Sequence, residues 1–315
     1  GRATLYSFNL GDLRWRAEQR VTGLSVTDVL VTPGRTPELW VSTLDATAGF
    51  NGPVLGGSSG ADLAPLGTLR SWVMRLAATD TDVFVAVQRP ENRGVYAWDG
   101  AAADWRLQGG ADIDTSVFYD LEAGSDGRLW LGTDRRGVWR SPDAGVTWQA
   151  VGDDVATVWS LATPVGAPQR VLAGLGTPEG GGGIGTPKGI RLTQDGGETW
   201  QLLAPGASAN RNDVLRNASL VTALAYSAGD PAVAFAAAWD NGLFLSRDGG
   251  TTWQYLDSPA GQRGYFEALI TLIPGNETEC ELLVAGGAGG VWVRNIRAQH
   301  ATVYQPQALT KLTIT

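Results

Sequence analysis

The chain has 315 residues, of which 43% are hydrophobic, and it carries a formal net charge of −8. A chain of this length can form one large all-β domain, and no apolar run approaches the roughly 18 residues that a membrane span needs. The negative charge and the lack of a basic run argue against binding to nucleic acid.

Cysteine and histidine each occur once, as Cys280 and His300. A single cysteine excludes an internal disulfide framework and a cysteine-rich metal site. A single histidine argues against a zinc site built from histidines and against a triad that depends on histidine. We therefore expect neither a metal nor a cofactor. The N-terminus lacks Met and shows no charged-plus-apolar leader, so we expect any such leader to have been removed or to lie outside this sequence.

Four types of strand recur in a fixed order, and the high glycine and tryptophan content suits many short strands joined by tight turns. The first type starts with an apolar residue and has an aliphatic residue three positions later; it is expected at 26–30, 73–77, 118–122, 158–162, 221–225, 266–270 and 309–313. The second is an apolar run, expected at 39–43, 83–87, 129–133, 171–175, 234–238 and 282–286. The third usually opens with glycine, as at 94–98, 137–141 and 242–246, with weaker copies at 4–8 and 53–57. The fourth begins at Trp105, Trp148, Trp200 and Trp253.

The segments at the two chain ends each contain only part of the regular set of four strands. Residues 4–15 resemble third and fourth strands without a first and second, and 309–315 resembles a first strand that nothing follows. Pairing them would close a ring and remove an open sheet edge. We therefore predict an all-β fold, a seven-bladed β-propeller closed by a composite N-/C-terminal blade, with 1–315 as a single domain. Six blades are the alternative, in which the terminal strands extend a neighbouring sheet.

One phrase marks the turn before three of the fourth strands. It reads Ser-Pro-Asp-Ala-Gly-Val-Thr-Trp at 141–148 and returns, varied, at 193–200 and 246–253. Its aspartate can accept N–H groups across the turn, its glycine permits a positive φ, and its tryptophan can pack between sheets. We interpret the following residues as structural: Asp143, Gly145, Trp148, Asp195, Gly197, Trp200, Asp248, Gly250 and Trp253.

The pattern Ser/Thr-x-Asp-x-Gly-x-Thr-Trp resembles the Asp-box, or bacterial neuraminidase repeat, and the chain resembles the Asp-box β-propellers over essentially its whole length. That family includes sialidases, xyloglucan-cleaving hydrolases, sorting-receptor ectodomains and photosystem assembly factors. The resemblance implies a sialidase-like fold without implying one activity. The Arg-Ile-Pro segment of the sialidases is absent here. A single propeller also lacks the cleft between two propellers that the xyloglucanases use.

Strand order determines which loops share a face. The aspartate turns join third to fourth strands and share one face with the first-to-second turns, so the second-to-third and fourth-to-first loops share the other. The long segments fall on this second face, here called the long-loop face: 44–52, 88–93, 176–188, 205–219 and 257–264. Insertions gathered on one face of a repeat protein usually mark its binding surface.

Aromatic, charged and amide residues near the long-loop face suit a sugar, a polar small molecule or a peptide. The candidate ligand-binding residues are Tyr119, Tyr265, Trp239, Arg135, Arg136, Asp134, Asp240, Asn241, Arg89 and Arg93. Packing between blades is the preferred interpretation for Phe118, Trp159 and Phe266. Charged residues also occupy the third position of several first strands, and there we predict a salt link from Arg75 to a neighbouring carboxylate rather than an open polar channel.

No recognisable catalytic set is present, so the preferred hypothesis is a non-catalytic propeller that binds a protein partner or a glycan through the long-loop face. A glycoside hydrolase is the alternative, with carboxylates from Asp45, Asp134, Glu179, Asp213 or Asp240. An assembly factor or a subunit of a larger complex is the third hypothesis. The scarcity of lysine indicates a GC-rich bacterial source, and we expect a secreted, periplasmic or cell-surface location.

Overall fold

A computed structural model describes most of the chain. The described residues are 2–9, 14–113, 117–152, 156–176, 189–203, 220–239, 242–256, 266–272, 281–287, 290–296 and 310–312, with side chains described from Gly23 to Leu256. Within these ranges the regular structure is β apart from one short 3-10 turn, η1 (Ala46–Ala48). The described ranges contain no helix of the length and hydropathy required to traverse a bilayer. The all-β prediction is therefore confirmed.

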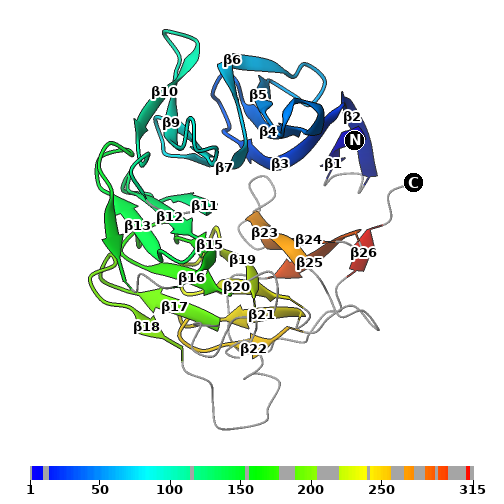
Figure 1. The fold of residues 1–315 in the computed structure, drawn as a ribbon. Coiled ribbons are helices and arrows are strands. Elements are labelled where there is room, and N and C mark those ends of the chain that lie inside the picture. Colours follow the sequence, from blue (N-terminus) through cyan, green and yellow to red (C-terminus); the bar gives the residue numbers. More distant parts are fainter. Residues whose placement is uncertain are drawn as a thin grey trace.

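In the part of the chain that the structure describes, the strands form six four-stranded antiparallel sheets and one two-stranded hairpin. Within each four-stranded sheet the strands follow chain order from the centre outwards, and we number the sheets 1 to 6 along the chain (Figure 1). The innermost strands are β3 (Leu24–Val31), β7 (Val73–Ala78), β11 (Phe118–Ala123), β15 (Val158–Ala162), β19 (Val221–Tyr226) and β23 (Phe266–Leu272). The second strands are β4 (Leu39–Asp45), β8 (Val83–Val87), β12 (Leu129–Thr133), β16 (Val171–Leu175), β20 (Ala234–Ala238) and β24 (Glu281–Gly287).

The outer half of each sheet is less regular in length. The third strands are β5 (Gly52–Gly57), β9 (Gly94–Asp99), β13 (Val138–Ser141), β17 (Gly189–Thr193), β21 (Gly242–Ser246) and β25 (Gly290–Ile296). The outermost are β6 (Ala64–Ser71), β10 (Asp104–Gly109), β14 (Gln149–Val151), β18 (Gln201–Leu202), β22 (Gln254–Tyr255) and β26 (Thr310–Leu312). Each innermost strand contacts the innermost strand of the next sheet, from β3 through to β23. Figure 1 shows the resulting arrangement of sheets around a common centre, which is that of a β-propeller.

The predicted composite blade is wrong for the strands that the structure describes. The C-terminal strand β26 pairs with β25, with Leu312 opposite Val291, and so forms the outer edge of sheet 6 rather than the inner strand of a shared sheet. At the other end β1 (Arg2–Asn9) and β2 (Arg14–Thr22) form a hairpin of their own, and β1 contacts β3. The reason is that the open edge of β25 offers unpaired N–H and C=O groups, which a following strand satisfies locally.

Most of the described apolar core lies between neighbouring sheets. Trp130 of sheet 3 belongs to one buried cluster with Leu175 of sheet 4. Phe84 of sheet 2 belongs to another with Leu131 of sheet 3. The second strands, which have a neighbouring sheet on each face, are buried at every residue in β8, β12, β16 and β20. Such strands read as continuous apolar runs, which is why the sequence predicted them closely.

The three aspartate turns share one set of hydrogen bonds. In the first, the Thr147 N–H and hydroxyl donate to the Asp143 carboxylate at 2.8 and 2.7 Å, and the Ser141 hydroxyl donates to it at 2.9 Å. Equivalent bonds surround the other two aspartates. Bonds from the Thr199 hydroxyl and N–H lower the pKa of Asp195 to about 2. These carboxylates stabilise turns by accepting local donors.

Glycine at the fifth position of the phrase is required by its backbone and by the next sheet. Gly250 has a φ of 99°, and a Cβ there would lie 2.6 Å from Leu172 Cδ2. We expect Gly250→Ala to lower the free energy of unfolding by about 2–4 kcal/mol, since left-handed strain adds to overpacking. Gly127→Ala is the matched control, because Gly127 has a φ of 83° with no heavy atom within 4 Å of a Cβ; strain alone should cost about 1–2 kcal/mol. If urea unfolding shows the same loss of stability for both variants, the contact of the new Cβ with Leu172 in the neighbouring sheet adds no cost.

Candidate functional site

One hydrogen bond recurs on the long-loop face. The N–H of the residue after a second strand donates to the carbonyl of the residue before the first strand of the same sheet. The pairs are Gln88 to Trp72 (3.1 Å), Asp134 to Val117 (3.0 Å), Gly176 to Thr157 (3.2 Å) and Trp239 to Leu220 (2.9 Å). In each described pair, the start of a first strand therefore lies beside the start of a second-to-third loop.

A β-bulge follows near the start of each innermost strand, at the second residue of β7, β11, β15, β19 and β23 and at the fourth residue, Thr27, of β3. The register shifts between Val73 and Arg75, between Phe118 and Asp120, and at the equivalent place in the other four sheets. A bulge leaves one residue unpaired and re-aims its side chain. Tyr119 and Trp159 occupy this position in sheets 3 and 4, and their rings stack with centroids 4.3 Å apart. Sequence reasoning had assigned Trp159 to packing between blades, which this contact agrees with, and Tyr119 to the candidate site.

A second aromatic group lies on the same face between sheets 1 and 2. Phe50, in the loop between β4 and β5, packs on Trp72 with ring centroids 5.3 Å apart. The Arg89 guanidinium lies 5.7 Å from the centre of the Trp72 ring. Phe50 is 45% exposed. Arg89 was predicted from the sequence, whereas Phe50 was missed, because only its loop and not its exposure can be inferred from position.

The predicted site residues Asp134 and Arg135 interact with each other and with Thr157. The Thr157 hydroxyl donates to Asp134 Oδ1 at 3.1 Å, and the Arg135 N–H donates to that hydroxyl at 3.2 Å. Arg135 Nε lies 3.9 Å from Asp134 Oδ1, but the Arg135 side chain is 81% exposed. Arg136 is also exposed. These residues gather in one loop of sheet 3, on the long-loop face.

The remaining predicted residues are dispersed or undescribed. Trp239 is half-buried at the end of the second strand of sheet 5, and Arg93 is half-buried before the third strand of sheet 2. Tyr265, Asp240 and Asn241 lie outside the described residues. The structure thus brings Arg89 together with an aromatic pair, and Tyr119 together with Trp159.

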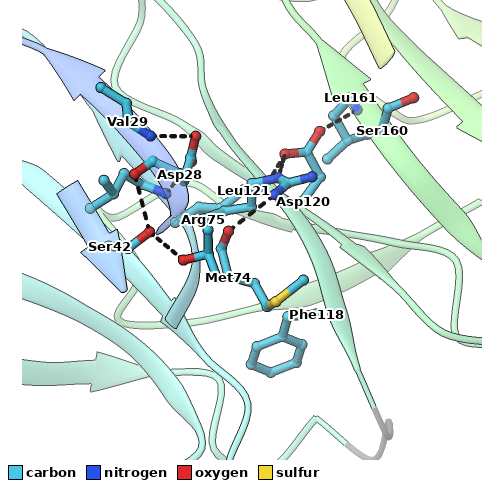
Figure 2. Close-up of polar contacts among 12 residues, drawn as sticks. Asp28, Val29, Ser42, Met74, Arg75, Phe118, Asp120, Leu121, Ser160 and Leu161 are labelled. Carbon is cyan, nitrogen blue, oxygen red and sulfur yellow. Dashed lines mark hydrogen bonds and ion pairs between the residues drawn. The ribbon is translucent and has the colours of Figure 1, made fainter. Parts of the chain in front are cut away.

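The centre of the ring is held by polar contacts between successive innermost strands (Figure 2). Arg75 Nε lies 3.3 Å from Asp120 Oδ1, which confirms the predicted salt link. The Leu76 N–H donates to Asp28 Oδ2 at 2.9 Å, and the Leu161 N–H donates to Asp120 Oδ2 at 2.6 Å. Burial raises the pKa of Asp28 to about 6 and also raises that of Asp120. Each carboxylate therefore links its sheet to the next one.

A cavity of about 580 Å³ opens on the opposite face, among the short turns. Glu122 lines it together with Asp80, Asp82 and Asp126. The Thr163 hydroxyl and N–H donate to Glu122 Oε1 at 3.0 and 3.2 Å. Burial, and then the nearby charge of Asp120, raise the pKa of Glu122 to about 8. Sequence reasoning missed this cavity, because it exists only where turns of three successive sheets meet.

Comparisons with known proteins identify the fold of this chain through its structural neighbours. No protein-family model matches the chain, and no curated protein does. Among solved structures, the GH74 enzyme of Niastella koreensis superposes with a TM-score of 0.59 at 14% identity, over 91% of this chain and 45% of that one. YCF48 bound to D1 peptide gives 0.58 at 13%, over 89% and 80%. The extracellular domain of the putative one component system BT4673 from B. thetaiotaomicron gives 0.58 at 12%, over 85% and 32%.

These neighbours are β-propellers. The chain is a β-propeller. At such identities the likeness shows the fold alone, and the chain spans less than half the length of the GH74 and BT4673 chains. The propeller has two faces of different chemistry: aromatic and arginine side chains on the long-loop face, and an acidic cavity on the face of the aspartate turns.

The raised pKa of Glu122 has a consequence for stability. Between pH 4.5 and 8 the folded protein keeps a proton on Glu122 that the unfolded chain has lost. The folded state then binds more protons, so the free energy of unfolding falls as the pH rises through this window. Each unit of difference in pKa corresponds to about 1.4 kcal/mol. Glu122→Gln keeps an acceptor for Thr163 but cannot titrate. We expect this variant to lose at least about 1 kcal/mol less unfolding free energy than the wild type between pH 4.5 and 8.

The measurement is chemical unfolding of both proteins at a series of pH values. Glu198→Gln is the control, because the Glu198 side chain is 71% exposed. Parallel curves for the wild type and Glu122→Gln would show that Glu122 titrates as it does in the unfolded chain.

Proposed function

We propose that this chain is a non-catalytic Asp-box β-propeller, a single domain over 1–315, that binds a protein partner or a glycan through the long-loop face. The observation that carries the proposal is the pairing of aromatic rings with arginine on that face. Phe50 and Trp72 offer ring surface beside the Arg89 guanidinium. Aromatic and arginine side chains contribute most of the binding energy in many interfaces. Of the two ligand classes we favour the protein partner.

Assignment to the Asp-box propellers is supported by the three aspartate turns, whose hydrogen bonds repeat from sheet to sheet. The chain's likeness to YCF48 bound to D1 peptide, and to an extracellular domain, agrees with partner binding and with an exported location. We therefore place the protein outside the cytoplasm of a bacterium, in the periplasm, at the cell surface or secreted. An assembly factor or a complex subunit would use the same surface.

The described carboxylates of the long-loop face favour binding over catalysis. Asp45 caps η1: its Oδ1 accepts from the Thr47 hydroxyl at 2.6 Å, the Thr47 N–H at 2.9 Å and the Ala48 N–H at 3.2 Å. The bonds from Thr47 lower the pKa of Asp45, which makes it a poor general acid. Asp134 accepts from Thr157. The other proposed acids, Glu179, Asp213 and Asp240, lie outside the described residues.

Phe50→Asn tests the proposal with little disturbance of the backbone. Phe50 has a φ of 70°, and asparagine tolerates this conformation better than most residues. Arrays of peptides and of glycans should retain the wild-type protein, and we expect Phe50→Asn to weaken binding at least about tenfold by removing an exposed ring.

Val146→Asn is the matched control, since Val146 is 54% exposed in an aspartate turn on the other face. Binding that survives Phe50→Asn but is lost in Val146→Asn would transfer the site to that face. Failure of the wild type to bind any peptide or glycan would overturn the proposal.

The cavity of Glu122 supports a second candidate function, a glycoside hydrolase. Such enzymes pair a protonated carboxyl group with a carboxylate about 5–10 Å away. Glu122 is protonated at neutral pH, and three aspartates share its cavity. A panel of chromogenic glycosides that includes sialosides is the test. Turnover that Glu122→Gln abolishes would replace the binding-only proposal, and absence of turnover would exclude this candidate for those substrates.

A further inference from the structure

Arg89 is a cation without a counter-ion. Its guanidinium rests over the Trp72 ring and makes no hydrogen bond or ion pair with any residue that the structure describes. Its Nε is buried and has no hydrogen-bond partner. The side chain as a whole is only half-buried, so part of the group remains accessible. A partly buried charge that lacks a partner is costly, and a ligand anion would offset that cost.

Asn51, in the loop between β4 and β5, carries an unpaired acceptor one residue from Phe50. The Asn51 Oδ1 atom is buried without a hydrogen-bond partner. Its chain neighbour Phe50 packs on Trp72, the ring that also carries Arg89. On the other side of Phe50, a Cβ at Gly49 would lie 3.7 Å from Arg89 Nη2. Gly49 therefore lies beside the guanidinium, and the next residue, Phe50, packs on the Trp72 ring that the guanidinium covers.

We propose that Phe50, Trp72 and Arg89 form a subsite that takes a carboxylate carried by an acidic peptide. The inference rests on the proposed function and names the ligand chemistry of this part of the long-loop face. A guanidinium binds a carboxylate through two parallel hydrogen bonds. A neighbouring apolar side chain of the same peptide packs on the exposed part of Phe50.

A peptide fits this set of groups better than an acidic sugar does. The subsite combines one cation and an apolar ring surface, and a short segment with Asp or Glu beside an apolar residue supplies the complement of both. A uronic or sialic acid supplies the carboxylate and the ring contact, but its hydroxyl groups add donors and acceptors, and the unpaired acceptor of this loop, Asn51 Oδ1, is buried. The acidic glycan is therefore an alternative outcome of the test.

The test compares two pools of fluorescent hexapeptides by anisotropy. One pool carries Asp or Glu flanked by apolar residues, and the other carries Asn or Gln in the same positions. We expect the wild type to bind the acidic pool at least about tenfold more tightly, the effect of one charge-assisted pair. Arg89→Gln should abolish the preference, and Arg89→Lys should retain part of it, because the charge stays while the planar fork is lost.

Arg106→Gln is the matched control, since Arg106 is exposed, lies on β10 away from the subsite, and loses the same charge. Thermal melts establish that each variant is folded. Equal binding of the two pools by the wild type, or an acidic preference that persists in Arg89→Gln, would overturn the inference.

Two further outcomes separate this inference from the proposed function. Binding that Phe50→Asn weakens but Arg89→Gln does not would remove the carboxylate subsite and leave the binding face in place. Binding of oligogalacturonate or sialyllactose that depends on Arg89, with no binding of the acidic peptides, would replace the peptide by an acidic glycan.

Discussion

Packing between the faces of successive sheets is the constraint on which the rest of this structure depends. A single four-stranded sheet cannot bury both of its faces, and here successive sheets from 1 to 5 cover one another's faces. Burial at every position of β8, β12, β16 and β20 follows directly. The same close approach leaves no room for a side chain at Gly250, which faces Leu172 of the preceding sheet. The glycine of the repeated phrase is thus fixed by two neighbouring sheets and not by its turn alone.

Convergence of the innermost strands explains the unusual titration of the centre. Asp28 and Asp120 each come directly after the bulge of their strand, and each accepts an N–H from the following sheet. Arg75 is the cation between them and pairs with Asp120. Side chains two residues apart in a strand point to the same face, so Glu122 follows Asp120 into the buried region. Its raised pKa is a consequence of strand geometry in a crowded centre.

The sequence predicted the inner strands well and the outer ones poorly, for a physical reason. Val83–Val87 and Val171–Leu175 were predicted at their observed bounds, because fully buried strands contain few polar residues. Strand β6 (Ala64–Ser71), half exposed and without the tryptophan phrase, was missed. Thr310–Leu312 was predicted as a strand but given the wrong place in its sheet, since inner or outer position depends on a pairing partner far away in the chain.

The site was predictable only in part. Strand order alone gave the grouping of loops on two faces, and Arg75 was correctly expected to meet a carboxylate. The bulges were missed, although the sequence carried their signal: apolar residues at the first and fourth positions of a strand, instead of strict alternation, require one extra residue between them. The stacked Tyr119 and Trp159 rings depend on two such bulges lying side by side, and the Glu122 cavity on turns of three sheets. Neither the ring contact nor the cavity can be predicted from a local sequence pattern.

Phe50 gives the strongest argument that the long-loop face is a ligand-binding surface. It holds a left-handed backbone conformation, with a φ of 70°, that costs a bulky residue about 1–3 kcal/mol. Its ring is nevertheless 45% exposed, so burial recovers only part of that cost through Trp72. Asparagine or glycine would suit the folded state better at this position. A strained, exposed aromatic ring beside an unpaired arginine is therefore poorly explained by stability of the free protein, and contact with a ligand supplies the missing stabilisation.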